Sequence, residues 1–181
     1  MEDRPVLTDT RCELALRSIS VMADGTLEDF EEVLHPEFLN HEQKDEPPTA
    51  RGVGPATAYA TALWLRDAFA DLRWEIHEVV AENDLVVIHC TMHGRHVRPF
   101  VSYDADAKVN EAFPPTGKTF ASTQTHWLRL KDDKVIEHWA NRDDLGMAVE
   151  LGWVPPTPLY LLRSAVAKRR ARRAARAFVL T

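Results

Sequence analysis

Residues 118–140, KTFASTQTHWLRLKDDKVIEHWA, decide the fold, because they predict two long strands joined by a tight turn. The strands cover 118–130 and 135–140, with KDDK between them. Side chains alternate between the two faces of a strand, so Gln124 and His126 share one face of the first strand. His138 lies on the second strand. Each face of the predicted sheet carries a histidine, and the pattern alone leaves open which face turns inward.

Working outward, the alternation of apolar and polar residues predicts two further strands, at 72–79 and 85–97. Helical spacing predicts helices at 8–22, 26–34, 55–71 and 142–151, with Thr8 or Asp9 capping the first and Thr26 opening the second. The segments 41–54 and 98–117 are expected to be loops. Consecutive strands with tight turns predict an antiparallel sheet, and helices gathered before it make the fold α+β. Such a sheet must curl around its helices, which leaves a concave space for a ligand.

The chain divides by composition into an α+β domain, 1–152, and a tail, 153–181, made of a Pro-rich spacer and an Arg-rich helix over 159–178. The net charge of −6 comes from 22 basic and 28 acidic residues. Seven of the basic residues and none of the acidic ones follow Glu150. An acidic body argues against a nucleic-acid-binding protein. We expect the tail to dock on the body; contact with an anionic membrane surface is a weaker alternative.

Composition narrows the class of protein. The hydrophobic fraction of 45% is that of an ordinary globular domain, and no stretch approaches the length of a transmembrane helix. The two cysteines, Cys12 and Cys90, cannot form a disulfide framework. The expected compartment is the cytoplasm. The sequence has no glycine-rich phosphate loop, no Gly-x-Ser-x-Gly elbow and no His-Glu-x-x-His motif.

Three segments carry a family resemblance: LHPEFLNHE at 34–42, FPPTGK at 113–118 and KVIEHWANRDDLGM at 134–147. With this order and spacing the chain resembles the SnoaL-like polyketide cyclase (ester cyclase) family, of the nuclear transport factor 2-like superfamily. The resemblance implies a cone-shaped α+β barrel and a homodimer or larger assembly. It also implies ring closure on polyketide intermediates by intramolecular aldol condensation, with no metal and no cofactor.

The resemblance also implies a set of site residues. The family's pocket glutamine and histidine fall on Gln124 and His126, whereas its strand aspartate falls on Ala140, which cannot transfer a proton. We therefore expect Asp143 to replace it as the proton-transfer residue. Asp143 could instead be a carboxylate at a helix N-terminus, as could Asp144. Five further residues are expected to border the pocket: Asn40, His41, His138, Trp139 and Asn141.

The sequence thus predicts an enzyme that acts on a small molecule, with acid/base chemistry on an apolar, polyketide-like carbonyl substrate. The main alternative is a non-catalytic small-molecule-binding member of the same fold, because Ala140 lacks the carboxylate. A weaker alternative is a partner-binding module that uses the basic tail.

Overall fold

The computed structural model describes residues 10–179 and has the expected α+β architecture. Its helices are α1 (Thr10–Asp24), α2 (Leu27–Val33), α3 (Pro55–Ala68), α4 (Asp144–Glu150) and α5 (Pro158–Val179). The predicted capping site Thr26 is confirmed, since its side chain accepts from the Asp29 backbone N–H and the Asp29 carboxylate accepts in return. The other predicted caps, Thr8 and Asp9, lie outside the described residues.

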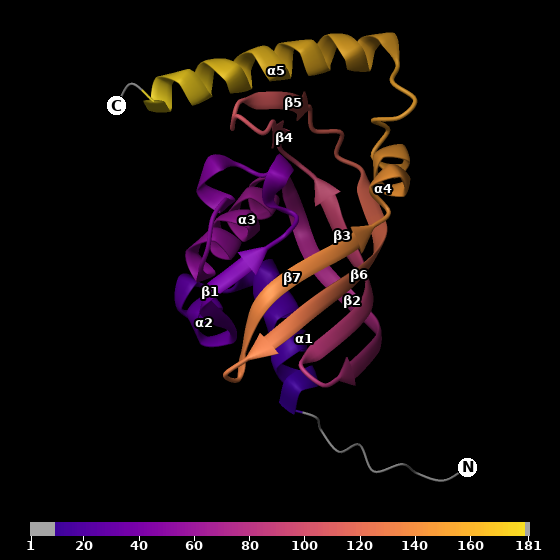
Figure 1. Ribbon diagram of the computed structural model, residues 1–181. Helices are drawn as coiled ribbons and strands as arrows, with labels where there is room; N and C mark the ends of the chain where they lie inside the picture. The colour runs from indigo at the N-terminus through magenta and orange to yellow at the C-terminus, as the bar shows by residue number, and fades with distance from the viewer. Residues whose placement is uncertain (1–9, 180–181) are drawn as a thin grey trace, which may run out of the picture.

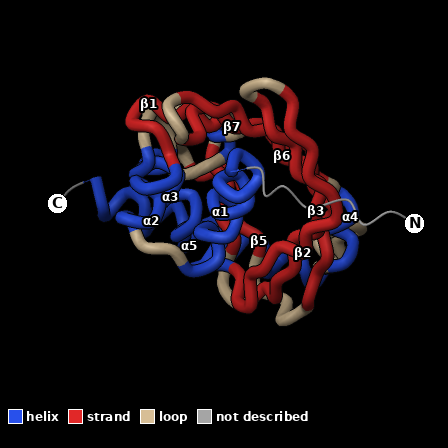
Figure 2. Tube along the Cα trace, turned by 90° about the horizontal axis from the view of Figure 1, so that it is seen from below, coloured by secondary structure: helices blue, strands red, loops and turns tan. Residues whose placement is uncertain are grey.

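The main sheet has five strands in the order β1-β7-β6-β3-β2. They are β1 (Leu34–Asn40), β2 (Phe69–Glu82), β3 (Leu85–His96), β6 (Thr119–Lys131) and β7 (Lys134–Arg142). The pairs β2–β3 and β6–β7 are antiparallel, as their tight turns predict, and β3–β6 is antiparallel across the longer connection. The sheet curls around α1 and α3, which lie inside its concave face (Figure 2). The curled sheet over N-terminal helices is therefore confirmed.

The sheet is mixed rather than wholly antiparallel, because β1 pairs in parallel with β7. The sequence pattern predicts a helix through Leu34 and no strand before residue 41. Helix α2 ends at Val33, and Leu34, Phe38 and Asn40 then alternate as buried residues along an edge strand. Proline is tolerated at such an edge because it has no N–H to donate to a neighbour. The result matters for the site, since Asn40 comes to lie opposite His138.

The second difference is a hairpin within the segment 98–117, which was expected to be a long connection. Strands β4 (Phe100–Tyr103) and β5 (Val109–Phe113) pair antiparallel. The turn between them is built on Asp104, whose carboxylate accepts from the backbone N–H groups of Asp106 and Lys108. Four- and five-residue strands offer too few alternating positions for a sequence pattern to be visible.

The core forms two apolar clusters. The first joins α1, α2 and α3 to the sheet and includes Phe30, Val33 and Ile88. The second is aromatic and includes Phe69, Phe120 and Trp153. Figure 1 shows α5 lying across the end of the molecule above β4 and β5.

Helix α5 is attached to the hairpin through basic side chains. Lys168 lies 2.6 Å from Glu111, and Arg172 donates to the Val109 carbonyl. Arg163 donates to the Pro115 carbonyl. In the described part of the chain, no helix combines the length and the apolarity needed to cross a membrane.

Candidate functional site

The concave space is a cavity of about 550 Å³ between the sheet and the helices. Most of its wall is apolar and aromatic, with side chains from α1, α3, β2 and the β4–β5 hairpin. The aromatic lining residues are Phe30, Phe38, Trp64, Phe69, Trp74, Phe100, Phe113 and Trp153. Protein sites that bind small molecules typically have this form: a mostly apolar cavity with a few polar groups.

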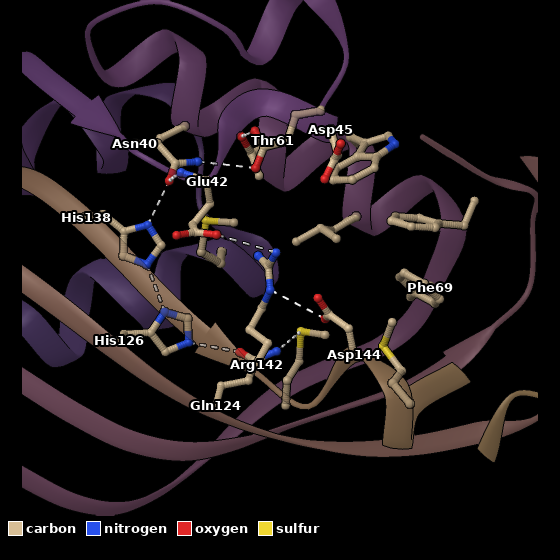
Figure 3. Close-up of a pocket in the computed structure, with 18 of the residues that line it drawn as sticks. Asn40, Glu42, Asp45, Thr61, Phe69, Gln124, His126, His138, Arg142 and Asp144 are labelled. Carbon is tan, nitrogen blue, oxygen red and sulfur yellow. Dashed lines mark hydrogen bonds and ion pairs between the residues drawn. The ribbon is translucent and has the colours of Figure 1, made fainter. Parts of the chain in front are cut away.

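Four polar side chains on β6, β7 and β1 line one wall of the cavity (Figure 3). They form one hydrogen-bonded chain. His126 Nε2 lies 2.9 Å from Gln124 Oε1, and His126 Nδ1 lies 2.9 Å from His138 Nε2. His138 Nδ1 in turn lies 3.0 Å from Asn40 Oδ1. The strand register produces the chain, because Gln124 and His126 alternate inward on β6 and Asn40 lies opposite His138 on β1.

Both ends of this chain are fixed as hydrogen-bond acceptors. Trp74 Nε1, which can only donate, points at Gln124 Oε1 at 3.3 Å. The backbone N–H of Glu42, also only a donor, points at Asn40 Oδ1 at 3.1 Å. Between two acceptors the histidine pair has three places for an N–H, whereas two neutral imidazoles carry two protons. The arrangement therefore has room for one proton more than the neutral pair holds.

Burial opposes that third proton. It lowers the pKa of His126 to about 4 and the pKa of His138 well below its ordinary value, with the Arg142 charge adding to both. Both histidines are consequently uncharged at neutral pH. An anion formed in the cavity would favour the third proton, and the positively charged pair would then stabilise the anion electrostatically.

A buried carboxyl group continues the polar wall beyond Asn40. Glu46 lines the cavity, is only 5% exposed and comes from the loop between β1 and α3. Its Oε1 accepts from Asn40 Nδ2 at 3.2 Å, and its Oε2 lies 2.5 Å from Thr61 Oγ1. Burial raises the pKa of Glu46 to about 7, against the opposing effects of Thr61 and Arg142.

The loop that carries Glu46 is held by its own backbone contacts. Arg51 donates to the Glu46 carbonyl at 3.0 Å and to the Asp104 carbonyl of the β4–β5 turn at 2.7 Å. Gly54 then opens α3 with φ of 102°, in the left-handed region that favours glycine. These contacts direct the Glu46 side chain inward.

The other charged lining residues are more open to solvent. Arg142 lies 3.9 Å from Glu42 and 3.5 Å from Asp144, whose side chain is 64% exposed (Figure 3). Asp45 and Glu111 also border the cavity and are exposed. Five carboxyl groups against one arginine make this part of the cavity unfavourable for an anionic ligand.

The structure does not bring Asp143, the expected proton-transfer residue, to the cavity. Asp143 is exposed and is the N-cap of α4, where its carboxylate accepts from the Gly146 backbone N–H at 2.8 Å. It is not among the residues that line the cavity. A β-carbon on Gly146 would lie 2.2 Å from Asp143 Oδ2, so the glycine makes room for this cap. The alternative given above for Asp143, a carboxylate at a helix N-terminus, describes its position.

The remaining expected pocket residues divide by strand face. Asn40 and His138 line the cavity, together with Gln124 and His126. Trp139 and Asn141 alternate with His138 and so lie on the other face of β7, outside the cavity lining. His41 also lies outside the lining and stacks on Trp139 with ring centroids 4.7 Å apart.

Sequence reasoning missed Glu46, Thr61 and Glu42. Glu46 lies in a polar segment beside two prolines, where an acid is usually exposed, and no local pattern indicates its burial. Its partner Thr61 is 15 residues away on α3. Within residues 10–179, no group of three or more His, Cys, Asp or Glu side chains is arranged to hold a metal ion.

Comparison with known proteins shows the family of the chain. The model of the SnoaL-like polyketide cyclases matches residues 13–151. The chain belongs to the SnoaL-like polyketide cyclase family. The match covers α1 through α4, including every polar residue of the cavity wall, and it supports a cyclase-type enzyme.

Two relatives are similar to this chain in sequence, and two solved structures are similar to it in fold. The chain is 30% identical to aklanonic acid methyl ester cyclase DnrD of Streptomyces peucetius, over 82% of this chain and 95% of the relative. It is 28% identical to nogalonic acid methyl ester cyclase of Streptomyces nogalater, over 74% and 91%. The structure of TsrD from Streptomyces laurentii superposes with a TM-score of 0.65 at 22% identity, covering 84% of this chain and 98% of that one. A protein with a ketosteroid isomerase-like fold from Catenulispora acidiphila gives 0.57 at 9% identity, over 77% and 92%.

Proposed function

We propose that this SnoaL-like protein closes a ring by intramolecular aldol condensation on an apolar, carbonyl-bearing, polyketide-like substrate. The observation that carries the proposal is the hydrogen-bonded chain Gln124–His126–His138–Asn40 on one wall of a mostly apolar cavity. Such a wall can orient a carbonyl group, while the apolar remainder excludes water from the enolate.

The reaction is a redistribution of one proton and one carbon–carbon bond. A base removes the proton α to one carbonyl, the enolate carbon attacks a second carbonyl carbon, and the resulting alkoxide takes the proton back. Negative charge moves from the first oxygen to the second. A positive charge on the histidine pair and the Gln124 amide N–H are suited to stabilise that charge.

The relatives suggest the first substrates to test. They are cyclases of aklanonic and nogalonic acid methyl esters. An ester is uncharged where the free acid is an anion, which suits a cavity bordered by Glu42, Glu46 and Asp144. We expect the methyl ester to be preferred over the corresponding free acid.

The test is turnover of aklanonic acid methyl ester by the purified protein, followed by chromatography and NMR because ring closure leaves the mass unchanged. We expect His126→Gln to lower kcat by on the order of 100-fold, as loss of a group that stabilises the oxyanion does. His77→Gln is the matched control, because His77 is exposed on β2. Binding of the ester without turnover would replace the cyclase by the non-catalytic binding protein.

A further inference from the structure

We propose that Glu46 is the catalytic acid/base of this protein, the carboxyl group that takes the α-proton of the substrate and returns it to the alkoxide. The inference rests on the cyclase function proposed above and assigns the residue that this function needs. It is required because β7 carries Ala140 where the family resemblance implies an aspartate. Ala140 lies opposite His126 and has no side chain that can carry a proton.

Position is the first argument. Glu46 borders the same cavity as the histidine pair and is joined to it by a single residue, since Asn40 donates to Glu46 and lies within hydrogen-bonding distance of His138. A substrate whose carbonyl oxygen meets the histidines can therefore present the neighbouring carbon to Glu46. The base and the oxyanion donors are then on adjacent parts of one wall, as enolate formation requires.

The hydrogen bonds of Thr61 are the second argument. Its hydroxyl lies 2.5 Å from Glu46 Oε2 and 3.2 Å from the Thr57 carbonyl oxygen. A hydroxyl has one proton to donate. When Glu46 is protonated, Glu46 donates to Thr61 and Thr61 donates to Thr57. When Glu46 is ionised, the Thr61 hydroxyl turns and donates to Glu46. Both protonation states are thus hydrogen-bonded without movement of a heavy atom, which suits a group that gains and loses a proton in every cycle.

The other carboxyl groups at the cavity are less suited to this role. Glu42 and Asp144 are ion-paired with Arg142, and Asp45 and Glu111 are exposed. Each of them is therefore paired with the arginine or open to solvent, unlike Glu46. Of the carboxyl groups that line the cavity among residues 10–179, Glu46 is the one classed as buried. A carboxyl group in this environment can hold or release a proton near neutral pH, where general acid/base catalysis is most efficient.

The proton and electron balance of the proposed cycle closes without a further reactant. The Glu46 carboxylate takes the α-proton, and the C–H electron pair becomes the enolate. The enolate carbon forms the new carbon–carbon bond, while the π electrons of the attacked carbonyl become the alkoxide lone pair. The alkoxide takes the proton from Glu46, which regenerates the carboxylate.

The experiment compares Glu46→Gln with the wild-type protein, with aklanonic acid methyl ester as the probe. Glutamine can accept from Asn40 and donate to Thr61, so it copies the protonated carboxyl group but cannot transfer its proton. We expect kcat to fall by on the order of 100-fold or more with KM nearly unchanged. Exchange of the substrate α-proton in D₂O should fall by the same factor. The matched control is Glu37→Gln, at an exposed carboxylate on β1, and it should keep wild-type turnover.

The outcomes separate this inference from the proposed function. A wild-type protein that closes the ring together with an equally active Glu46→Gln variant would overturn the role of Glu46 and leave the cyclase intact. A wild-type protein that binds the ester but neither closes the ring nor exchanges the proton would overturn both. If Glu46→Gln does not fold by circular dichroism, Glu46→Asp replaces it: exchange that persists at a reduced rate supports the proposal, and an unchanged rate contradicts it.

Discussion

Two carboxyl groups, Asp143 and Glu46, have opposite environments. Asp143, at the junction of β7 and α4, is exposed and bonded to a backbone N–H. Glu46, in the loop between β1 and α3, is buried and bonded to a threonine hydroxyl and an amide. A backbone N–H only donates, so it favours the anionic carboxylate, whereas a hydroxyl can donate or accept.

The comparison teaches that the partner of a carboxyl group, more than its place in a motif, determines what it can do. Asp143 stands in the segment that carries the family resemblance and contributes to the end of a helix. Glu46 stands outside those segments and borders the cavity. We therefore expect substitution of Asp143 to change stability slightly and to leave turnover unchanged. Substitution of Glu46 should change both the pH dependence of stability and the turnover.

The largest expected effect is on the pH dependence of stability at Glu46. The folded state raises the pKa of Glu46 from 4.5 to about 7. Between these values the folded protein binds more protons than the unfolded chain, so Glu46 costs stability as pH rises through this window. Glu46→Gln removes that cost. As the pH rises from about 4 to about 9, the free energy of unfolding of the variant should increase by roughly 3 kcal/mol relative to that of the wild type.

The measurement is urea denaturation of both proteins across that pH range. The buried histidines titrate in both proteins, so their contribution cancels in the difference. A difference that does not change with pH would mean that Glu46 keeps an ordinary pKa in the folded protein, and the comparison with Asp143 would lose its basis.

The next effect concerns the Thr61 hydroxyl, which can hydrogen-bond Glu46 in both of its protonation states. Thr61→Val keeps the shape of the side chain and leaves the buried carboxyl without one partner, which should cost about 1–2 kcal/mol of stability. The Thr61 hydrogen bond lowers the pKa of Glu46, so its loss should raise that pKa further. If ionised Glu46 is the base, the acid limb of the kcat/KM profile moves to higher pH. Thr61→Ser keeps the hydroxyl and should keep the wild-type profile; a shift in both variants would point to packing instead.

The strands of the site were predictable from local pattern. Gln124 and His126 alternate on a long strand with a polar turn after it, so their shared face follows from a period of two residues. The inward direction of that face did not follow, because both faces carry histidines. It is set by the helices and by the aromatic cluster around Phe69 and Trp153, which are distant in the sequence.

The parts that could not be predicted depend on single non-local contacts. Edge strand β1 is held by β7, about one hundred residues later, and Pro36 looks like a helix stop when taken alone. The burial of Glu46 depends on Thr61 and on Arg51, which no repeat in the sequence connects to it. Asp143 could be given two roles from its position, and the hydrogen bond from the Gly146 backbone N–H, which favours the cap, cannot be seen in the sequence.

The smallest expected effect is at Asp143 and completes the comparison. Asp143→Ala removes the N-cap of α4 and should lower the free energy of unfolding by about 1 kcal/mol. Asp143→Asn keeps a capping oxygen, so its free energy of unfolding should stay within about a few tenths of a kcal/mol of the wild-type value. Both variants should keep wild-type turnover, because neither change touches the cavity lining. Loss of turnover in Asp143→Asn with its stability intact would return the proton-transfer role to Asp143, since the amide keeps the cap and removes only the carboxylate.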